Sequence, residues 1–416
     1  MERLLTAGDA IDRIPDGSRI VASQACGTPT TLVTALAERC DGRRLSLWAG
    51  LLLEHEALVD GVGRGELGFN TWHITAAFEP LLADRSISYV PLRASRVPAQ
   101  LASWSLEVAM VRVTPPDRHG WCSLGPSVGY VRAALDNASL RIAEVDQTLP
   151  RTWGDSMVHV SGLDVLVDST QPMPVYEAAS PNDASRAIAR HVLDLLPDRP
   201  LLQLGIGTVP EALVAVFAED GVSDLRFTGM ASDGMVDLAD RGLLDRRHRD
   251  GLPPISTPDM LGTSKLMRWA DENPAVGLYP STIAHSPVLL GALDRLVSVN
   301  SALEVDLSGQ VNSERVRGRQ ISGIGGSIDF CEGAINSPGG VGVIALPSTT
   351  RDGEISRIVP RLGEDSTVTI PGSLVDFVVT EHGVARLEGR SSVERAEALI
   401  AIAAPQYRDE LLAAMR

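Results

Sequence analysis

Two carboxylates and an amide alternate along one apolar segment, residues 295–307. In an extended strand alternate side chains share a face, so Asn300, Glu304 and Asp306 would line one side of this segment. A solvated strand face would give the same pattern. If carboxyl chemistry occurs here, Glu304 is the candidate nucleophile, and Asn300 or Asp306 would hold it in orientation.

Amine chemistry has one candidate, because Lys265 is the only lysine among the 37 basic residues. A Schiff-base enzyme would need it as the covalent amine, and a Walker-A nucleotide site would need it within G-x-x-x-x-G-K-[ST]. Leu266 follows it where that motif requires Ser or Thr, and no strand is expected before it. Both classes are therefore set aside.

A glycine-rich turn, residues 203–210, lies between an expected strand and an expected helix. Gly205 and Gly207 would let backbone amides at the helix start face an anionic group. The turn shares only its first two glycines with a dinucleotide-binding fingerprint, since position 210 is proline. Taken alone, the turn fits a ligand-free connection better than a binding site.

A second glycine-rich run, residues 321–330, contains Gly323, Gly325 and Gly326. Such spacing permits close backbone approach, which would suit a substrate carbonyl or the pantetheine arm of CoA. A bulge or crossover between packed sheets would explain it equally well. A third run, residues 336–340, is typical of an ordinary loop.

Composition and charge limit the class of partner. The chain has 416 residues, a formal net charge of -16 and no long run of arginines, which disfavours nucleic acid and anionic membranes. Its four cysteines are isolated, so neither a metal site nor a disulfide framework is expected. Met1 to Leu5 lack a long apolar stretch, and we expect no signal peptide or membrane span and a cytoplasmic location.

The elements that would position these residues alternate between strands and helices. Short runs rich in Val, Ile and Leu alternate with segments of helical spacing, which predicts an α/β fold with buried parallel strands. The Pro- and Asp-rich stretch 168–183 is the best linker candidate. We therefore predict two tandem domains, 1–183 and 184–416. The expected strands are 19–22, 108–113, 163–167, 200–204, 341–346 and 376–380, and the expected helices are 30–40, 185–196, 210–217 and 393–404.

Several motifs together resemble the acetyl-CoA hydrolase/transferase family, which includes 4-hydroxybutyrate, butyrate:acetate and succinyl-CoA:acetate CoA-transferases. The resemblance covers nearly the whole chain and is densest in the second half. No single motif identifies the family, but the motifs together do. The motifs lie at 114–120, 122–125, 143–145, 149–155, 205–207, 232–234, 299–310, 323–326, 329–330, 355–360 and 379–385.

The resemblance implies two tandem open α/β domains of the CoA-transferase type, with the active site between them. It implies that Glu304 is the covalent nucleophile of a CoA-transferase acting on a short-chain acyl-CoA and a carboxylic acid. It also implies a homodimer or tetramer and no permanently bound cofactor or metal, with coenzyme A entering as substrate. Backbone amides at Gly205 and Gly207, at Gly323, Gly325 and Gly326, and at Gly383 are the candidates for oxyanion or CoA binding. Asn300, Asp306, Gln203 and Glu381 are candidates for lining the site.

The chain departs from the family pattern before its Ser232-Asp233-Gly234 motif. Family members commonly carry a His-Ser-Glu or His-Thr-Glu run there, whereas this chain has Phe227-Thr228-Gly229. Two alternatives therefore remain open beside the transferase. The first is an acyl-CoA hydrolase that uses Glu304 and lets water intercept the intermediate. The second is an acyl-CoA-binding relative without turnover, which the altered run motivates.

Overall fold

The computed structural model describes residues 4–53, 56–247 and 249–415, so the first three residues of the N-terminal segment discussed above lie outside it. The described chain divides into two compact units, and the main crossing falls between Glu177 and Ala178. The first unit also takes in residues 231–233 and 255–284. The predicted boundary at residue 183 stays a prediction.

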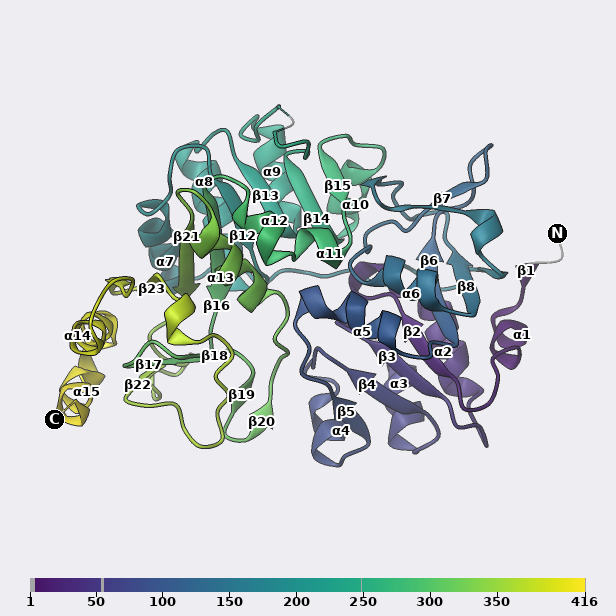
Figure 1. Ribbon diagram of the computed structural model, residues 1–416, viewed down its shortest axis with the longest axis horizontal. Helices are drawn as coiled ribbons and strands as arrows, with labels where there is room; N and C mark the ends of the chain where they lie inside the picture. Colours follow the sequence, from purple (N-terminus) through teal and green to yellow (C-terminus); the bar gives the residue numbers. More distant parts are fainter. Residues whose placement is uncertain (1–3, 54–55, 248, 416) are drawn as a thin grey trace. The chain divides into compact units, whose positions relative to one another are not determined.

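The first unit is built on a parallel sheet whose strands are short and apolar. Its central strand, β6 (Val108–Val113), is buried at every position, as expected for a strand covered on both faces. Helices α5 and α6 lie together in front of the strands in Figure 1. The sheet order is β1 (Leu4–Leu5), β11 (Val165–Asp168), β8 (Leu140–Val145), β6, β2 (Arg19–Ala22), β3 (Ser46–Ala49), β4 (Gly68–Thr71) and β5 (Ile87–Tyr89).

The other elements of the first unit are a small antiparallel ribbon, three further strands and the helices. Strands β7 (Trp121–Ser123) and β10 (Met157–His159) pair antiparallel. Strands β14 (Ile255–Met260), β15 (Val276–Leu278) and β9 (Trp153–Gly154) pair in parallel in that order. The helices are α1 (Ala7–Asp12), α2 (Thr30–Glu38), α3 (Glu56–Gly63), α4 (Glu79–Ala83), α5 (Val97–Ser103), α6 (Val131–Asn137), α10 (Ser264–Ala270) and α11 (Ser281–Ala284).

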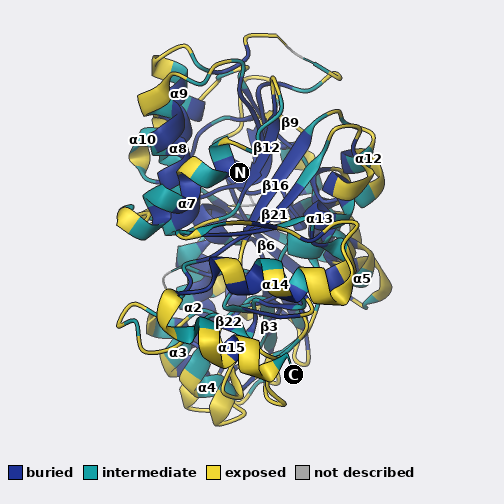
Figure 2. Ribbon diagram, turned by 90° about the vertical axis from the view of Figure 1, so that its left-hand side faces the viewer, coloured by how far each residue is buried: buried dark blue, intermediate teal, exposed yellow. Residues whose placement is uncertain are grey.

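The second unit repeats the plan with a different strand order. Its strands run β24 (Gly383–Arg386), β23 (Phe377–Thr380), β21 (Val341–Ala345), β16 (Leu296–Ser301), β12 (Leu201–Leu204) and β13 (Arg226–Ala231), and all pairs except β23–β24 are parallel. Figure 2 shows β12, β16 and β21 buried, with exposed outer faces on α14 and α15. The helices are α7 (Asp183–Leu193), α8 (Thr208–Asp220), α9 (Asp233–Asp240), α12 (Pro287–Gly291), α13 (Ser327–Asn336), α14 (Ser392–Ile402) and α15 (Arg408–Ala414).

Short strands outside the main sheet matter for the candidate nucleophile. A separate three-stranded sheet has the order β18 (Val311–Asn312), β17 (Glu304–Asp306) and β22 (Ile358–Val359), and β19 (Arg315–Val316) pairs with β20 (Arg319–Gln320). Its apolar side chains share a core with α14 that includes Val305, Val311 and Leu399. The predicted α/β class is confirmed in both units.

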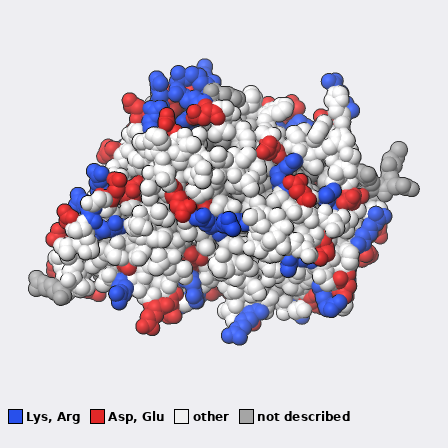
Figure 3. Space-filling model, viewed as in Figure 1, with Lys and Arg blue, Asp and Glu red and all other residues white. Residues whose placement is uncertain are grey.

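The surface carries charges of both signs. Basic and acidic side chains are interspersed over the face shown in Figure 3. Within the described residues, no helix combines the length and the apolar character required to cross a membrane.

Candidate active site

The carboxyl ends of β12, β13 and β16 bring several of the predicted residues together. Leu204 pairs with Gly229 on one side and with Val299 on the other, so the segments that follow these strands start side by side. The Asn300 amide Nδ2 donates to Gln203 Oε1 over 3.2 Å, and both side chains are buried. Ligands of open parallel sheets bind at this edge, which makes the Gln203–Asn300 pair a candidate for contacting substrate.

The turn after β12 has the form expected for a backbone binding site. Gly207 precedes α8 with φ 122°, a conformation that a residue with a side chain rarely adopts. No side chain caps this helix end. A Cβ atom at Gly205 or Gly207 would meet no other atom within 4 Å, so the turn is open to a ligand. The first amides of α8 can therefore bind an oxyanion or carbonyl oxygen.

The second glycine run also leads into a helix. Gly326 immediately precedes α13, and again no side chain caps the helix. A Cβ atom at Gly326 would come within 2.5 Å of the His285 ring, so glycine is required there for packing. Gly325 has φ 59° and open space around its Cα. Gly325 therefore offers an accessible backbone beside α13, while Gly326 is enclosed by His285.

His285 was not singled out from the sequence, where a single histidine gives no periodic signal. Its side chain is buried and lies 5.1 Å, centroid to centroid, from the Phe330 ring. Its Nδ1 has no hydrogen-bond partner among the described residues. Burial lowers its pKa to about 4, so the imidazole is neutral at pH 7.

The predicted single strand over residues 295–307 is wrong, because the chain leaves the main sheet after Ser301. Residues up to Ser301 form β16, and the chain re-enters a strand at Glu304 in β17 of the three-stranded sheet. The expected shared face is therefore divided between two sheets. Asn300 faces Gln203, while Glu304 and Asp306 belong to a different set of contacts.

Glu304 is half-buried and held through one of its carboxylate oxygens. Its Oε1 accepts hydrogen bonds from Asn312 Nδ2 at 2.8 Å and from Ser366 Oγ at 2.5 Å. Asn312 lies directly opposite Glu304 in the antiparallel pair of β17 and β18. Both donors fix the direction of the side chain through this one oxygen.

Asp306 is occupied by the turn that follows it. Its Oδ1 accepts from the Ser308 amide at 2.9 Å, from the Ser308 hydroxyl at 2.6 Å and from the Gln310 amide at 3.0 Å. This pattern stabilises the connection between β17 and β18. Asp306 therefore shapes the loop rather than pairing with the Glu304 side chain.

Glu381 and Gly383 lie at the end of β23 and the start of β24. The Glu381 carboxylate accepts from the Ser348 amide at 2.8 Å and the Ser348 hydroxyl at 2.6 Å. This contact ties the segments after β21 and β23 together. Gly383 has φ 142°, so the tight entry into β24 favours glycine.

A buried acid in the first unit was also not predicted. Asp259 in β14 accepts hydrogen bonds from Ser127 Oγ at 2.5 Å and from Gln24 Nε2 at 2.9 Å. Burial raises its pKa to about 6, above its usual 3.8. Gln24 follows β2, which places this acid near the carboxyl edge of the first sheet.

One group of side chains has the proximity needed for a metal ion. Among the described residues, the ligand atoms of Cys40, Asp41 and Glu66 lie within 4.8 Å of one another. Cys40 is engaged with the Ala37 carbonyl, and burial raises the pKa of its thiol, which disfavours the thiolate that binds metal. This cluster gives no support for a metal site.

Comparison with known proteins identifies the family. Residues 78–177 match the acetyl-CoA hydrolase/transferase N-terminal domain, and residues 262–415 match its C-terminal domain. The chain is 36% identical to the 4-hydroxybutyrate coenzyme A transferase of Clostridium kluyveri, over 99% of this chain and 96% of that protein. It is 32% identical to the butyryl-CoA:acetate CoA-transferase of Anaerostipes caccae, over 99% and 95%.

A solved structure extends the likeness to the fold. RipA from Yersinia pestis is 31% identical and has a TM-score of 0.91, covering 99% of this chain and 97% of that one. The fold is thus shared with a solved structure over nearly the whole chain. The chain belongs to the acetyl-CoA hydrolase/transferase family, as its motifs predicted.

Proposed function

We propose that this protein moves CoA between a short-chain acyl-CoA and a carboxylic acid, with Glu304 as the covalent nucleophile. The observation that carries the reaction type is the similarity over 99% of the chain to proteins named CoA-transferases. The placement of the Glu304 carboxylate, with Oε1 held by Asn312 and Ser366, supports its role.

Each step exchanges a carboxylate for a thiolate without oxidation or reduction. Glu304 Oε2 attacks the thioester carbonyl carbon, the C–S bond breaks, and CoA leaves as a thiolate, so that an acyl–glutamyl mixed anhydride remains. The thiolate attacks the glutamyl carbonyl and displaces the free acid, which leaves a glutamyl-CoA thioester. The acceptor carboxylate then attacks the glutamyl thioester and releases the CoA thiolate, which leaves a new mixed anhydride. The thiolate attacks the acceptor's acyl carbonyl in this anhydride, so that the new acyl-CoA leaves and the Glu304 carboxylate is restored.

The tetrahedral intermediates need hydrogen-bond donors for their oxyanions. Removing one such donor in other acyl-transfer enzymes costs about 3–4 kcal/mol. The uncapped start of α8 at Gly207 and the open backbone at Gly325 support these two turns as donors. Gly383, with φ 142°, is the third candidate.

Replacement of the nucleophile tests this proposal. We expect Glu304→Gln to lose at least about a thousandfold in kcat, because an amide oxygen is a poor nucleophile. Glu354→Gln, an exposed glutamate of the same unit, is the matched control and should retain wild-type activity. Full CoA exchange by Glu304→Gln would refute the role of this carboxylate.

A second candidate is acyl-CoA binding without glutamyl chemistry at the carboxyl edge of the sheet, and Gly229 favours it. Gly229 lies within β13, in the part of the chain where relatives commonly carry His-Ser-Glu or His-Thr-Glu, and has φ 79°. A Cβ atom there would approach Gln203 Cγ to 2.9 Å. The sheet edge that carries Gln203 and Asn300 therefore has a glycine where the glutamate of the family run would stand.

Gly229→Glu separates the two candidates. If Glu304 is the nucleophile, this substitution only strains the backbone and lowers both stability and activity. If the chain binds acyl-CoA without turnover, wild type and Glu304→Gln bind acetyl-CoA equally and neither exchanges labelled acetate. A gain of exchange in Gly229→Glu would then assign the missing carboxylate to position 229.

The hydrolase alternative concerns the acceptor rather than the nucleophile. Release of CoA from acyl-CoA in the absence of any added acid would identify water as the acceptor. Strict dependence on an added carboxylate identifies a transferase. We further propose a cytoplasmic homo-oligomer that uses CoA as substrate and holds no permanent cofactor, which the four free cysteines and the family membership support.

A further inference from the structure

The imidazole of His285 is buried in the second unit, and its Nδ1 lacks a hydrogen-bond partner. The residue is 7% exposed, and no described residue forms a hydrogen bond with this nitrogen. A buried polar atom without a partner is rare in folded proteins and calls for an explanation. Because Nδ1 is enclosed, Nε2 is the nitrogen through which the ring can meet a partner from outside the chain.

The His285 ring is held against the start of α13. A Cβ atom at Gly326, the residue that precedes this helix, would lie 2.5 Å from His285 Cδ2 and 2.8 Å from Nε2. Phe330, in the first turn of α13, lies against the same ring with 5.1 Å between centroids. The edge of the imidazole that carries Nε2 therefore faces the helix start.

Helix α12 fixes this arrangement, because it begins two residues after His285 and packs closely on α13. A Cβ atom at Gly333 of α13 would come within 2.6 Å of Leu290 in α12. Figure 1 shows the two helices in the second unit. The imidazole is therefore positioned by two packed helices.

The start of α13 offers backbone donors beside the ring. No side chain caps this helix of ten residues, and the Ser327 hydroxyl donates instead to the Ile324 carbonyl at 2.9 Å. The first helical bond runs from the Phe330 amide to the Gly326 carbonyl at 3.0 Å, so the earlier amides have no partner within the helix. Gly325 has φ 59° and open space around its Cα, which leaves this backbone accessible.

The charges around the ring favour an uncharged oxygen as the ligand. His285 is neutral at pH 7, because burial lowers its pKa to about 4. With its single ring proton on Nε2, the imidazole presents a donor to the helix start and keeps an acceptor at Nδ1. Asp329, in the first turn of α13, is fully buried. A neutral donor beside an acidic residue suits a carbonyl oxygen better than a phosphate.

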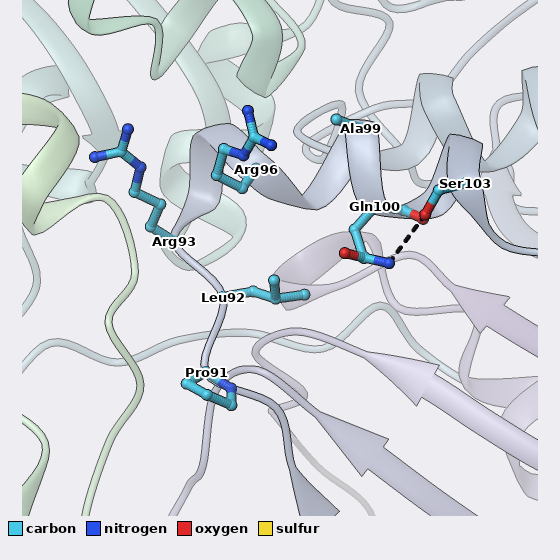
Figure 4. A pocket seen from close by; sticks show the side chains of 7 residues that line it. All are labelled: Pro91, Leu92, Arg93, Arg96, Ala99, Gln100 and Ser103. Carbon is cyan, nitrogen blue, oxygen red and sulfur yellow. Dashed lines mark hydrogen bonds between the residues drawn. The ribbon is translucent and has the colours of Figure 1, made fainter.

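The hollow beside α5 in the first unit contains no comparable group. Figure 4 shows Gln100 among the side chains that line it, and the Gln100 amide already donates to Ser103 Oγ at 3.0 Å. Arg93 in the same lining also has an interaction partner. This lining therefore gives no indication of a ligand.

We propose that His285 Nε2 and the amides at the start of α13 bind a carbonyl oxygen of the acyl-CoA. The inference rests on the proposed function, which supplies this ligand. An acyl-CoA has such oxygens at two places, the acyl thioester and the amides of its pantetheine arm. At the thioester, the same donors stabilise the oxyanion that forms during acyl transfer.

Two unreactive analogues separate these two sources. In the ketone analogue of acetyl-CoA a methylene group replaces the sulfur, so the acyl carbonyl remains and no thioester can be cleaved. S-ethyl-CoA has an acyl-sized group at sulfur, retains the pantetheine amides and lacks the acyl carbonyl. Calorimetric titration of the full chain gives the Kd of each analogue without turnover.

His285→Leu removes the donor and should raise the Kd of the ketone analogue about tenfold. An unchanged Kd for S-ethyl-CoA assigns the acyl carbonyl, and an equal rise for both analogues assigns a pantetheine amide. His191→Leu, which replaces a partly exposed histidine of α7 in the same unit, is the matched control.

Two further variants separate hydrogen bonding from packing. A glutamine amide can take the place of Nε2, whereas an asparagine amide reaches only the place of Nδ1. His285→Gln should therefore keep the Kd within about threefold of wild type, while His285→Asn should resemble His285→Leu. Melting temperatures identify a variant that fails to fold, and if His285→Leu does so, the comparison of His285→Gln with His285→Asn carries the test.

The proposal is overturned if both Kd values in His285→Leu stay within about twofold of those in His191→Leu, or if His285→Gln binds no better than His285→Asn. A wild-type chain that binds neither analogue overturns it as well. Neither titration needs the Glu304 carboxylate, so the two proposals fail separately. Full CoA exchange by Glu304→Gln would refute the proposed nucleophile and still leave a raised Kd in His285→Leu as support for this site.

Discussion

Asp259 is a carboxylic acid enclosed by a hydroxyl and an amide, and it carries a consequence for stability. Because its pKa is raised from 3.8 to about 6, the folded state keeps a proton that the unfolded state loses between those values. The free energy of unfolding therefore falls as pH rises through this window, and the loss is complete above about pH 6.

Asp259→Asn cannot ionise, so the fall in the free energy of unfolding with rising pH that Asp259 causes should disappear. The asparagine amide can donate to Ser127 Oγ while its oxygen accepts from Gln24, so the contacts survive. Relative to wild type, its free energy of unfolding should rise between pH 4 and pH 7 by up to about 3 kcal/mol, measured by urea denaturation. Asp136→Asn, an exposed acid of the same unit, is the control. A difference in the free energy of unfolding between Asp259→Asn and wild type that is the same at every pH would contradict this account of Asp259.

Gly207 and Gly221 flank α8 and allow conformational strain to be separated from ligand contact. Both have positive φ, 122° and 68°, and open space around Cα. Alanine at either position should lower the free energy of unfolding by about 1–3 kcal/mol. Only Gly207→Ala should also lower kcat/KM, because only its turn faces substrate in the proposal. Equal loss of activity in both variants would argue that strain alone is responsible.

At the scale of elements, the start of α14 shows how local sequence can determine a boundary. Ser391 and Glu394 form a capping box in which Ser391 Oγ accepts from the Glu394 amide and the Glu394 carboxylate accepts from the Ser391 amide. Ser391→Ala should lower the free energy of unfolding by about 1 kcal/mol, measured by thermal or urea denaturation. Ser392→Ala, one residue inside the helix, should have little effect, and an equal loss in both would contradict the capping role.

The sequence predicted the strands and helices where a local signal exists. The expected strand at 108–113 matches β6 in both bounds, and the expected helix at 393–404 covers most of α14. The expected helix at 210–217 is shorter than α8 because Gly207 and Gly221, rather than the apolar pattern, set its ends.

Long-range pairing explains what the sequence did not reveal. The break between β16 and β17 depends on Val305 pairing beside Ile358, more than fifty residues later, and no local signal announces it. The candidate residues Gln203, Asn300, Gly205 and Gly207 do lie together, whereas Glu304 is held by the distant Ser366.

At the scale of the whole molecule, family membership leads us to expect a homo-oligomer. Light scattering after size-exclusion chromatography should give a mass that is a multiple of the 44.3 kDa chain. Because opposite charges are interspersed on the surface, the mass should change little between low and moderate salt. A single 44.3 kDa species at micromolar concentration would contradict this expectation.

The glutamyl-CoA thioester is the intermediate that distinguishes the proposed transferase from a protein that only binds acyl-CoA. Incubation with acetyl-CoA, followed by borohydride treatment and peptide mass analysis, measures it directly. The account predicts that the peptide containing Glu304 changes mass as a reduced glutamyl residue in wild type and not in Glu304→Gln. An unmodified Glu304 peptide in a sample that is turning over acetyl-CoA would contradict it.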